Sequence, residues 1–248
     1  MKHSLFNIKI DLLNKPEVLS RFEEYRKSDK CNSIYFFNAH CFNIAQKNEE
    51  YLNAINVSDL LLNDGIGIKI ACKMAGLTTK ENMNGTDLIP DLIKLASTNR
   101  KKVFLLGGVE GIASKAKENI TVFSPEIIIA GACSGYFNEK EEAIIIDKIN
   151  NSRAEILILG MGVPKQELWA SNNMSKLSEV KVIIAGGAIL DFMAGKFSRA
   201  PKFIRRIGFE WLYRLSQEPR RLASRYFIGN IKFLWTISWY LAINKYHN

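Results

Sequence analysis

Glycines and small polar side chains follow five short apolar runs of this 248-residue chain, which is a pattern typical of ligand-binding turns. These turns are Asn38–His40, Asn63–Gly67, Gly107–Gly111, Gly160–Glu167 and Gly186–Ala188. Glycine at a strand-to-helix turn lets the backbone come close to a ligand, and the helix N-terminus that follows attracts phosphate. Several such turns at one edge of a sheet indicate a nucleotide or sugar-phosphate ligand, although glycine also ends strands for steric reasons alone.

The segment Gly160–Trp169, GMGVPKQELW, is the strongest local motif. Pro164 suits the first turn of a helix, so Lys165, Gln166 and Glu167 would place three polar groups in that turn. An ordinary solvated helix start could carry the same residues. Their position on the glycine-marked edge favours a functional role, and Gln166 can both donate and accept hydrogen bonds, which suits a sugar or a base.

Three carboxylates are predicted near the same edge. Asp64 follows the apolar run Leu60–Leu62 and is either a turn or capping aspartate or a general base at the mouth of the sheet. The residues alone favour the cap. Asp87 is equally ambiguous, because Thr86 is a natural N-cap and an acid stabilises the first helical turn. For Asp191 a structural cap is the favoured interpretation.

His40 is the only imidazole away from the chain ends, where His3 and His247 lie. It could act as a general base, but a lone histidine at a helix start is more often structural. The sequence contains no Ser-His-Asp arrangement, no His/Cys metal spacing and no Asp-x-Asp. We therefore expect no metal, and the charge of a pyrophosphate would have to be met by Arg, Lys and helix dipoles.

The elements that must position these residues alternate along residues 1 to about 195. Strands are predicted at Phe6–Ile10, Ile34–Asn38, Leu60–Asn63, Val103–Leu106, Glu126–Ala130, Ile156–Gly160 and Val182–Ala185. Helices are predicted within Pro16–Lys27, Cys41–Ala54, Ile66–Ala75, Thr86–Ser97, Lys140–Ile149 and Lys165–Met174. Runs such as VFLLGG and KVIIAGG are apolar on both faces, as in strands buried between helices. This predicts an α/β fold with a Rossmann-like, mostly parallel sheet flanked by helices.

The charge distribution separates residues 196–248 from this core. The composition, 47% hydrophobic and 24% charged, excludes a disordered, collagen-like or polytopic membrane protein. Residues 196–248 hold 11 of the 34 Lys+Arg and 2 of the 25 Asp+Glu, so they carry the whole formal charge of +9. We predict a catalytic core over 1–195 and a basic, aromatic appendage of two or three helices over 196–248. Its apolar run Phe233–Ile243 is shorter than the roughly 20 residues of a membrane span.

The cysteines and the N-terminus indicate the compartment. Cys31, Cys41, Cys72 and Cys133 show no CxxC spacing and lie in apolar stretches, which favours reduced thiols and a cytoplasmic location. The N-terminal residues alternate between apolar and polar, which predicts a first strand and not a signal peptide.

Six motifs occur in a fixed order between about residues 35 and 227. They are DGIGI, NGTDLIPDLI, VFLLGG, ILILGMGVPKQELW, GGAILDFMAGKFSRAP and the block from Glu210 to Arg221. Together they resemble the WecG/TagA/CpsF family of bacterial glycosyltransferases (glycosyltransferase family 26). The resemblance implies an inverting, metal-independent transfer of a sugar, N-acetylmannosamine or a related hexose, from a UDP-sugar donor to an undecaprenyl-diphosphate-linked saccharide. Such acceptors serve wall teichoic acid, enterobacterial antigen or capsule assembly.

The resemblance also implies roles for individual residues. Asp64 would be the base that deprotonates the acceptor hydroxyl, and Gln166 would lie in the donor site and reaction centre. Arg214, Arg221 and Arg225 would reach from the appendage to the diphosphate, with Arg214 in the catalytic set. The expected substrate-binding residues are completed by Asn38, Gly65, Asp87, Gly108, Gly162, Pro164, Lys165, Glu167 and Gly187.

Two departures from the family pattern leave the sugars open. Phe36 stands two residues before the strand-end Asn38, where teichoic-acid members carry a polar Thr. Asn82 stands three residues before Gly85, where many members have Arg.

The basic appendage has two interpretations. It could complete the site and dock on an anionic membrane, at the inner face of the bacterial cell membrane, with Trp235, Trp239 and Tyr240 at the interface. It could instead be an ordinary C-terminal helix with a solvated basic face. The expected lipid acceptor favours membrane contact. The sequence leaves the oligomeric state open, a homo-oligomer included.

Two other functions compete. An NAD-dependent Rossmann oxidoreductase is disfavoured because the first strand-to-helix turn lacks G-x-G-x-x-G. A nucleic-acid-binding module would use arginines interleaved with Trp and Tyr, but it leaves the glycine-marked edge of the core unexplained. We therefore expect no nucleic acid partner.

Overall fold

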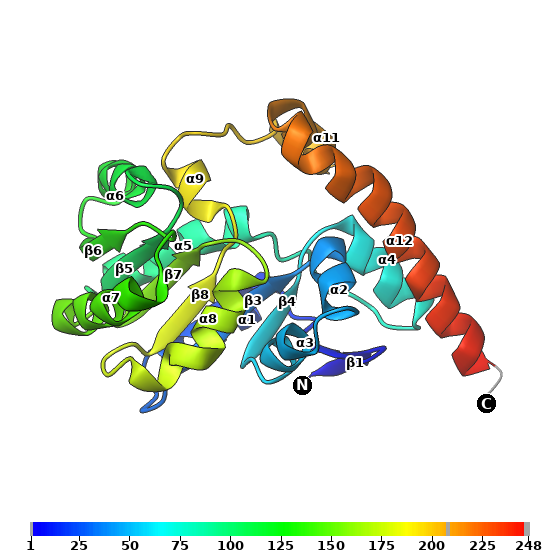
Figure 1. Ribbon diagram of the computed structural model, residues 1–248, viewed down its shortest axis with the longest axis horizontal. Coiled ribbons are helices and arrows are strands. Elements are labelled where there is room, and N and C mark those ends of the chain that lie inside the picture. The colour runs from blue at the N-terminus through cyan, green and yellow to red at the C-terminus, as the bar shows by residue number, and fades with distance from the viewer. Residues whose placement is uncertain (1, 207–208, 246–248) are drawn as a thin grey trace.

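Six parallel strands form the central sheet of the protein, whose computed structural model describes residues 2–206 and 209–245 (Figure 1). Their spatial order is β4-β3-β8-β7-β5-β6. The bounds are β3 Asn32–Phe37, β4 Leu60–Asn63, β5 Lys102–Gly107, β6 Ile128–Cys133, β7 Ile156–Gly160 and β8 Val182–Ala185. Every neighbouring pair is parallel, so the predicted α/β fold with a parallel sheet is confirmed.

Alternate residues of the strands enter two apolar layers, one on each side of the sheet. In β3, Ile34 and Phe36 face one layer, whereas Tyr35 and Phe37 face the other. Because side chains of a strand alternate in direction, a strand covered on both faces must be apolar throughout. This is why the apolar runs predicted the strands.

Helices cover both faces of the sheet (Figure 1). One layer contains α1 Lys15–Tyr25, α5 Gly85–Thr98, α6 Ile112–Phe123 and α9 Ile189–Met193. The other contains α2 Ala39–Ala45, α3 Glu49–Asn56, α4 Ile66–Met74, α7 Glu139–Ser152 and α8 Lys165–Asn173, followed by the short 3-10 helix η1 Met174–Lys176. The single helix predicted within Cys41–Ala54 is two helices, because the side chain of Asn48 accepts a hydrogen bond from the Tyr51 amide and starts α3.

Two short antiparallel strands, β1 His3–Leu5 and β2 Ile8–Ile10, replace the single first strand expected at the N-terminus. The chain reverses at Phe6, whose φ of 58° is in the left-handed region. Leu5, Ile8 and Ile10 are fully buried, so the hairpin closes one end of the core.

The appendage forms three helices, α10 Lys202–Arg206, α11 Glu210–Gln217 and α12 Pro219–Lys245. Helix α12 lies across α2 and α4 (Figure 1). Its buried Phe233 meets the ring of Phe42 edge-on at 5.2 Å, and Tyr240 stacks on Phe6 at 4.9 Å. Within 2–206 and 209–245, no helix combines the length and apolar character that a membrane crossing requires. His247 lies outside the described residues.

Candidate active site

The carboxyl ends of the six strands meet at one edge, because all strands run in the same direction. Phe37 of β3 pairs with Asn63 of β4, and Gly107 of β5 pairs with Gly160 of β7. Residues that follow these pairs therefore lie at the same level. Ligands of open parallel sheets bind at this edge.

Asp64, directly after β4, is partly buried at this edge. Burial raises the pKa of the Asp64 carboxyl from 3.8 to about 6. A side-chain hydrogen bond with Asn38 opposes this rise in pKa, and the negative charge of Glu210 adds to it. The positive charges of Arg225 and Arg214 lower the same pKa. The carboxylate is thus held close to two cations of the appendage, at a pKa that suits a general base near neutral pH.

Asn38, at the end of β3, is the N-cap of α2. Its Oδ1 accepts hydrogen bonds from the amides of His40 at 3.0 Å and Cys41 at 3.2 Å, and Nη2 of Arg225 lies 3.5 Å away. Burial lowers the pKa of His40 to about 4, with Arg225 and Arg221 adding to the effect. His40 is therefore a neutral imidazole at pH 7, beside cations.

Arg214, Arg221 and Arg225 converge from α11 and α12. Arg221 donates to Glu218 from Nε at 2.8 Å, and the guanidinium of Arg214 lies 4.8 Å from the ring centroid of Phe192. Among the described residues, no carboxylate lies within ion-pair distance of Arg214 or Arg225. Burial lowers the pKa of Arg214, and Arg225 and Arg221 lower it further. Partly buried arginines without a carboxylate suit a bound anion.

Three residues predicted to belong to the site, Lys165, Gln166 and Glu167, lie at the start of α8 and make hydrogen bonds within the protein. Gln166 is 1% exposed; its Oε1 accepts from the Gly187 amide at 3.0 Å and its Nε2 donates to Glu167 at 2.8 Å. Burial raises the pKa of the fully buried Glu167 to about 7, against the opposing hydrogen bond from Gln166. Lys165 donates to the carbonyl of Gly135 at 2.7 Å. The three residues fix turns at the sheet edge. Their contact with a UDP-sugar stays a prediction.

Two glycine turns at this edge have backbone conformations that favour glycine. Gly108, after β5, has a φ of 67°, and a Cβ there would lie 2.4 Å from Cγ2 of Ile112. Gly162, after β7, has a φ of 79° and precedes the cis peptide bond between Val163 and Pro164. Pro164 is the N-cap of α8, one position ahead of the first turn in which the sequence predicted it.

The two departures from the family pattern contact the start of α5 and the turn after Asp64. Phe36 is buried against Gly85, the first residue of α5, where a Cβ would lie 3.5 Å from its ring. Asn82 accepts a hydrogen bond from the amide of Gly65 at 2.6 Å. Phe36 is therefore a core residue under the start of α5, and Asn82 fixes the turn that follows Asp64.

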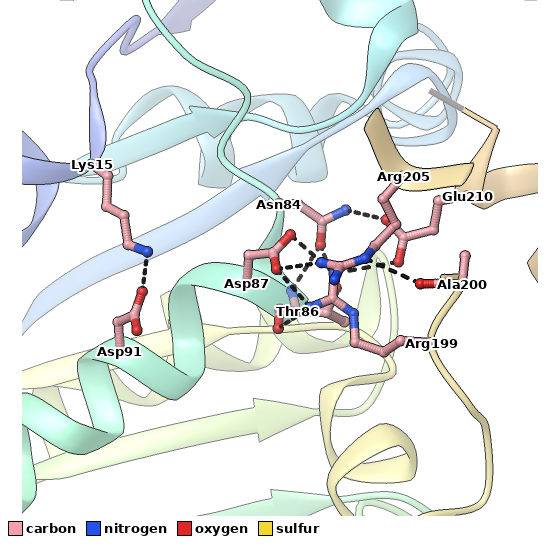
Figure 2. A network of polar contacts seen from close by, with 9 residues as sticks. All are labelled: Lys15, Asn84, Thr86, Asp87, Asp91, Arg199, Ala200, Arg205 and Glu210. Carbon is pink, nitrogen blue, oxygen red and sulfur yellow. Dashed lines mark hydrogen bonds and ion pairs between the residues drawn. The ribbon is translucent and has the colours of Figure 1, made fainter. Parts of the chain in front are cut away.

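Asp87, predicted to bind substrate, is paired with two arginines (Figure 2). Arg199 donates to it at 2.6 and 2.9 Å, and Arg205 at 2.9 Å. The hydrogen bond from Arg199 holds the pKa of Asp87 below its usual value. Asn84, and not Thr86, caps α5. Contact of Asp87 with a substrate stays a prediction.

Sequence reasoning did not identify Arg199, Arg205 or Glu210 as site residues. Arg199 lies 112 residues from Asp87 along the chain, and no local pattern indicates which arginine meets which carboxylate. The only signal was their position inside or next to the family motifs GGAILDFMAGKFSRAP and the block that begins at Glu210.

Potential metal ligands are dispersed in the structure, and the thiols are unpaired. Over the described ranges, no group of three or more His, Cys, Asp or Glu is placed to hold a metal ion. Whether the reaction needs a metal stays a prediction. All four cysteines are free thiols.

Comparisons with known proteins relate the whole chain to one family. A family model described as Glycosyl transferase WecG/TagA/CpsF family matches residues 3–247. An N-acetylglucosaminyldiphosphoundecaprenol N-acetyl-beta-D-mannosaminyltransferase of Bacillus spizizenii (strain ATCC 23059 / NRRL B-14472 / W23) is 30% identical over 177 residues, which cover 71% of this chain and 68% of the relative. A protein of the same name from Staphylococcus aureus (strain MRSA252) is 26% identical over 223 residues, 89% of this chain and 87% of the relative.

Proposed function

Because the chain belongs to the WecG/TagA/CpsF family of glycosyl transferases, we propose that it moves an N-acetylmannosaminyl group from a UDP-sugar to undecaprenyl-diphosphate-linked N-acetylglucosamine. The names of the relatives supply the transferred sugar and the acceptor. One observation of this chain carries the proposal. A carboxyl group with a raised pKa lies at the strand ends, close to two arginines that form no ion pair with any carboxylate of the described residues.

The proposed reaction is a single displacement at the anomeric carbon. Asp64 accepts the proton of the acceptor hydroxyl while that oxygen forms a bond to the anomeric carbon. The bond from this carbon to the UDP oxygen breaks, and UDP leaves with the bonding electrons. One displacement inverts the configuration, which agrees with the β product in the names of the relatives when the UDP-sugar is α-linked.

The appendage would stabilise the leaving group. Negative charge grows on the diphosphate as the bond breaks, and Arg214 and Arg225 offer positive charge that no carboxylate of the described residues neutralises. Such preorganised charge contributes most where water is excluded. We therefore assign the arginines to the leaving group and Asp64 to the nucleophile.

The test is UDP release from UDP-N-acetylmannosamine with a lipid-diphosphate N-acetylglucosamine acceptor. Asp64→Asn should lower turnover by about 10²–10⁴-fold, since this is the usual contribution of a general base, and should leave UDP binding intact. Asp29→Asn is the matched control, because Asp29 is exposed on the core. Turnover of Asp64→Asn close to wild type would refute the assignment. Retention of the rate in a chelator would support metal independence.

We also propose that the appendage docks on an anionic membrane at the cytoplasmic face. Large apolar side chains are exposed along one side of α12 and on α4. They are Phe227, Ile228, Ile231, Leu234, Trp235 and Trp239 on α12, with Ile66, Ile70 and Met74 on α4. An exposed apolar surface next to excess positive charge is typical of interfacial helices.

Vesicle co-sedimentation tests the docking. Binding should increase with the fraction of anionic lipid, because each Lys or Arg near such a surface contributes about 1 kcal/mol. Equal binding to neutral and anionic vesicles would contradict the proposal.

The competing functions are tested by thermal shift: UDP should raise the melting temperature, whereas NAD and an oligonucleotide at the same excess should not.

A further inference from the structure

A cluster of charges joins the first part of the appendage to the start of α5 (Figure 2). Arg199 donates to both carboxylate oxygens of Asp87, at 2.6 and 2.9 Å, and to the carbonyl of Thr86 at 3.2 Å. Arg205 donates from Nη1 to Asp87 at 2.9 Å and from Nε to the carbonyl of Ala200 at 3.1 Å. One carboxylate of the core therefore binds two arginines from the segment that leads into α11.

Glu210, the first residue of α11, extends this cluster. Its Oε1 lies 3.5 Å from Nη2 of Arg199, and its Oε2 accepts from Nδ2 of Asn84 at 3.2 Å. Arg214 follows four residues later, about one turn along the same helix. The start of α5 and the guanidinium of Arg214 are thus connected by a short series of hydrogen bonds and one helical turn.

We propose that Asp87 is a positioning residue that anchors the appendage and thereby holds Arg214 opposite Asp64. The consequence for catalysis rests on the proposed function, whereas the anchor does not. Both oxygens of Asp87 accept hydrogen bonds from arginines of the appendage, so its contribution to the reaction would run through the appendage. A bidentate Arg–carboxylate pair fixes geometry as well as adding energy, which suits this purpose.

Asp91 provides a matched comparison on the same helix. It lies one turn after Asp87 and forms an ion pair with Lys15 of α1, so both partners belong to the core (Figure 2). Removal of either carboxylate deletes an ion pair of α5. Only removal of Asp87 should release the appendage.

Hydrogen exchange of the full-length protein tests the anchor without any substrate. In Asp87→Asn, amides of residues 196–206 and 209–217 should exchange about tenfold faster, because part-exposed pairs contribute modestly and local opening exposes these amides. In Asp91→Asn their exchange should match wild type. Unchanged exchange in Asp87→Asn, or an equal increase in both variants, would overturn the anchor. Arg205→Gln, which leaves the core intact, should accelerate the same segments.

Steady-state kinetics test the positioning role. Asp87→Asn should lower kcat by about tenfold and change KM for the UDP-sugar by less than about threefold, since the arginines act on charge that grows in the transition state. Asp87→Glu should restore most of kcat. The double variant Asp87→Asn/Arg205→Gln should be no worse than Asp87→Asn, because the two residues act as one unit.

Three kinetic outcomes would overturn the positioning role of Asp87. They are a raised KM with kcat unchanged, additive losses in the double variant, and an unchanged kcat despite faster exchange. Failure of the proposed function itself is distinguishable, because the wild-type protein would then release no UDP while the exchange result still decides the anchor.

Discussion

The core and the appendage meet at the edge where the strands end, but they are held in place differently. All five residues of β7 are buried, and the sheet is covered on both faces. Of the side chains described in the appendage, four are buried: Ala200, Leu222, Phe233 and Ile237. The core places Asp64 by a packed sheet, whereas the appendage places its arginines by a few apolar contacts and a cluster of ion pairs.

This difference suggests a division of tasks. A base must stay at a fixed distance from the reacting carbon, and a sheet edge supplies that rigidity. An element that contacts a large lipid-linked substrate must let it enter and leave, and such elements come from the less stable parts of a fold. We expect the appendage to open without unfolding the sheet.

Phe233→Ala should give the largest effect. Phe233 is buried between Phe42 and Gly67, and truncation of a buried Phe costs about 3–5 kcal/mol. If the appendage opens independently, hydrogen exchange should accelerate over residues 219–242 and stay slow in β3 and β7. Phe227→Ala, on the exposed side of the same helix, is the control. Acceleration throughout the sheet would show that the two regions are one cooperative unit.

Arg214→Ala should lower the activity strongly and change the stability little. Loss of one donor to a developing negative charge lowers kcat by about 10²–10³-fold. The melting temperature should change little, because no ion pair of Arg214 is found among the described residues. Arg220→Ala, an exposed neighbour on α12, should keep wild-type kcat in the UDP-release assay. Equal losses of kcat in the two variants would mean that the activity depends on the total positive charge of the appendage and not on the position of Arg214.

Glu167→Gln, a substitution in the core, should change the free energy of unfolding in a pH-dependent way. Burial raises the pKa of Glu167 from 4.5 to about 7, so its contribution to stability is fully present below pH 4.5 and is lost as the pH rises through 7. At 1.36 kcal/mol per unit, the neutral variant should gain about 3 kcal/mol in free energy of unfolding at pH 8 and almost none at pH 4. Urea unfolding at both pH values measures this. A gain at pH 4 as large as at pH 8 would contradict the assigned titration.

Much of the fold could be predicted because its strands satisfy local rules. The strands at Leu60–Asn63, Ile156–Gly160 and Val182–Ala185 were predicted with both ends correct, since each apolar run ends at a glycine or polar turn. The edge strand β6 was predicted at Glu126–Ala130 but lies at Ile128–Cys133. β6 ends in Gly131, Ala132 and Cys133, whose small side chains give a weak apolar signal, so pairing with β5 sets this end of the strand.

The site could be predicted only as far as topology decides it. Asp64 and Asn38 had to share an edge, because both end parallel strands. The burial of Gln166 depends on the Gly187 amide, 21 residues away, and the pairing of Asp87 depends on arginines more than 110 residues away. Partners at such separations leave no periodicity in the sequence.

Trp235→Ser should give the smallest change in stability and isolates the outer face of the appendage. Trp235 is 73% exposed, so the free energy of unfolding should change by no more than about 0.5 kcal/mol. Binding to anionic vesicles should fall about tenfold, because an indole leaves the membrane interface. Val57→Ser is the control, since Val57 is 76% exposed on the core and should not affect co-sedimentation. If both variants bind vesicles like wild type, the exposed face of α12 does not contact lipid. If both variants lose binding equally, the core contacts the membrane as well as the appendage, and membrane contact does not distinguish the two regions.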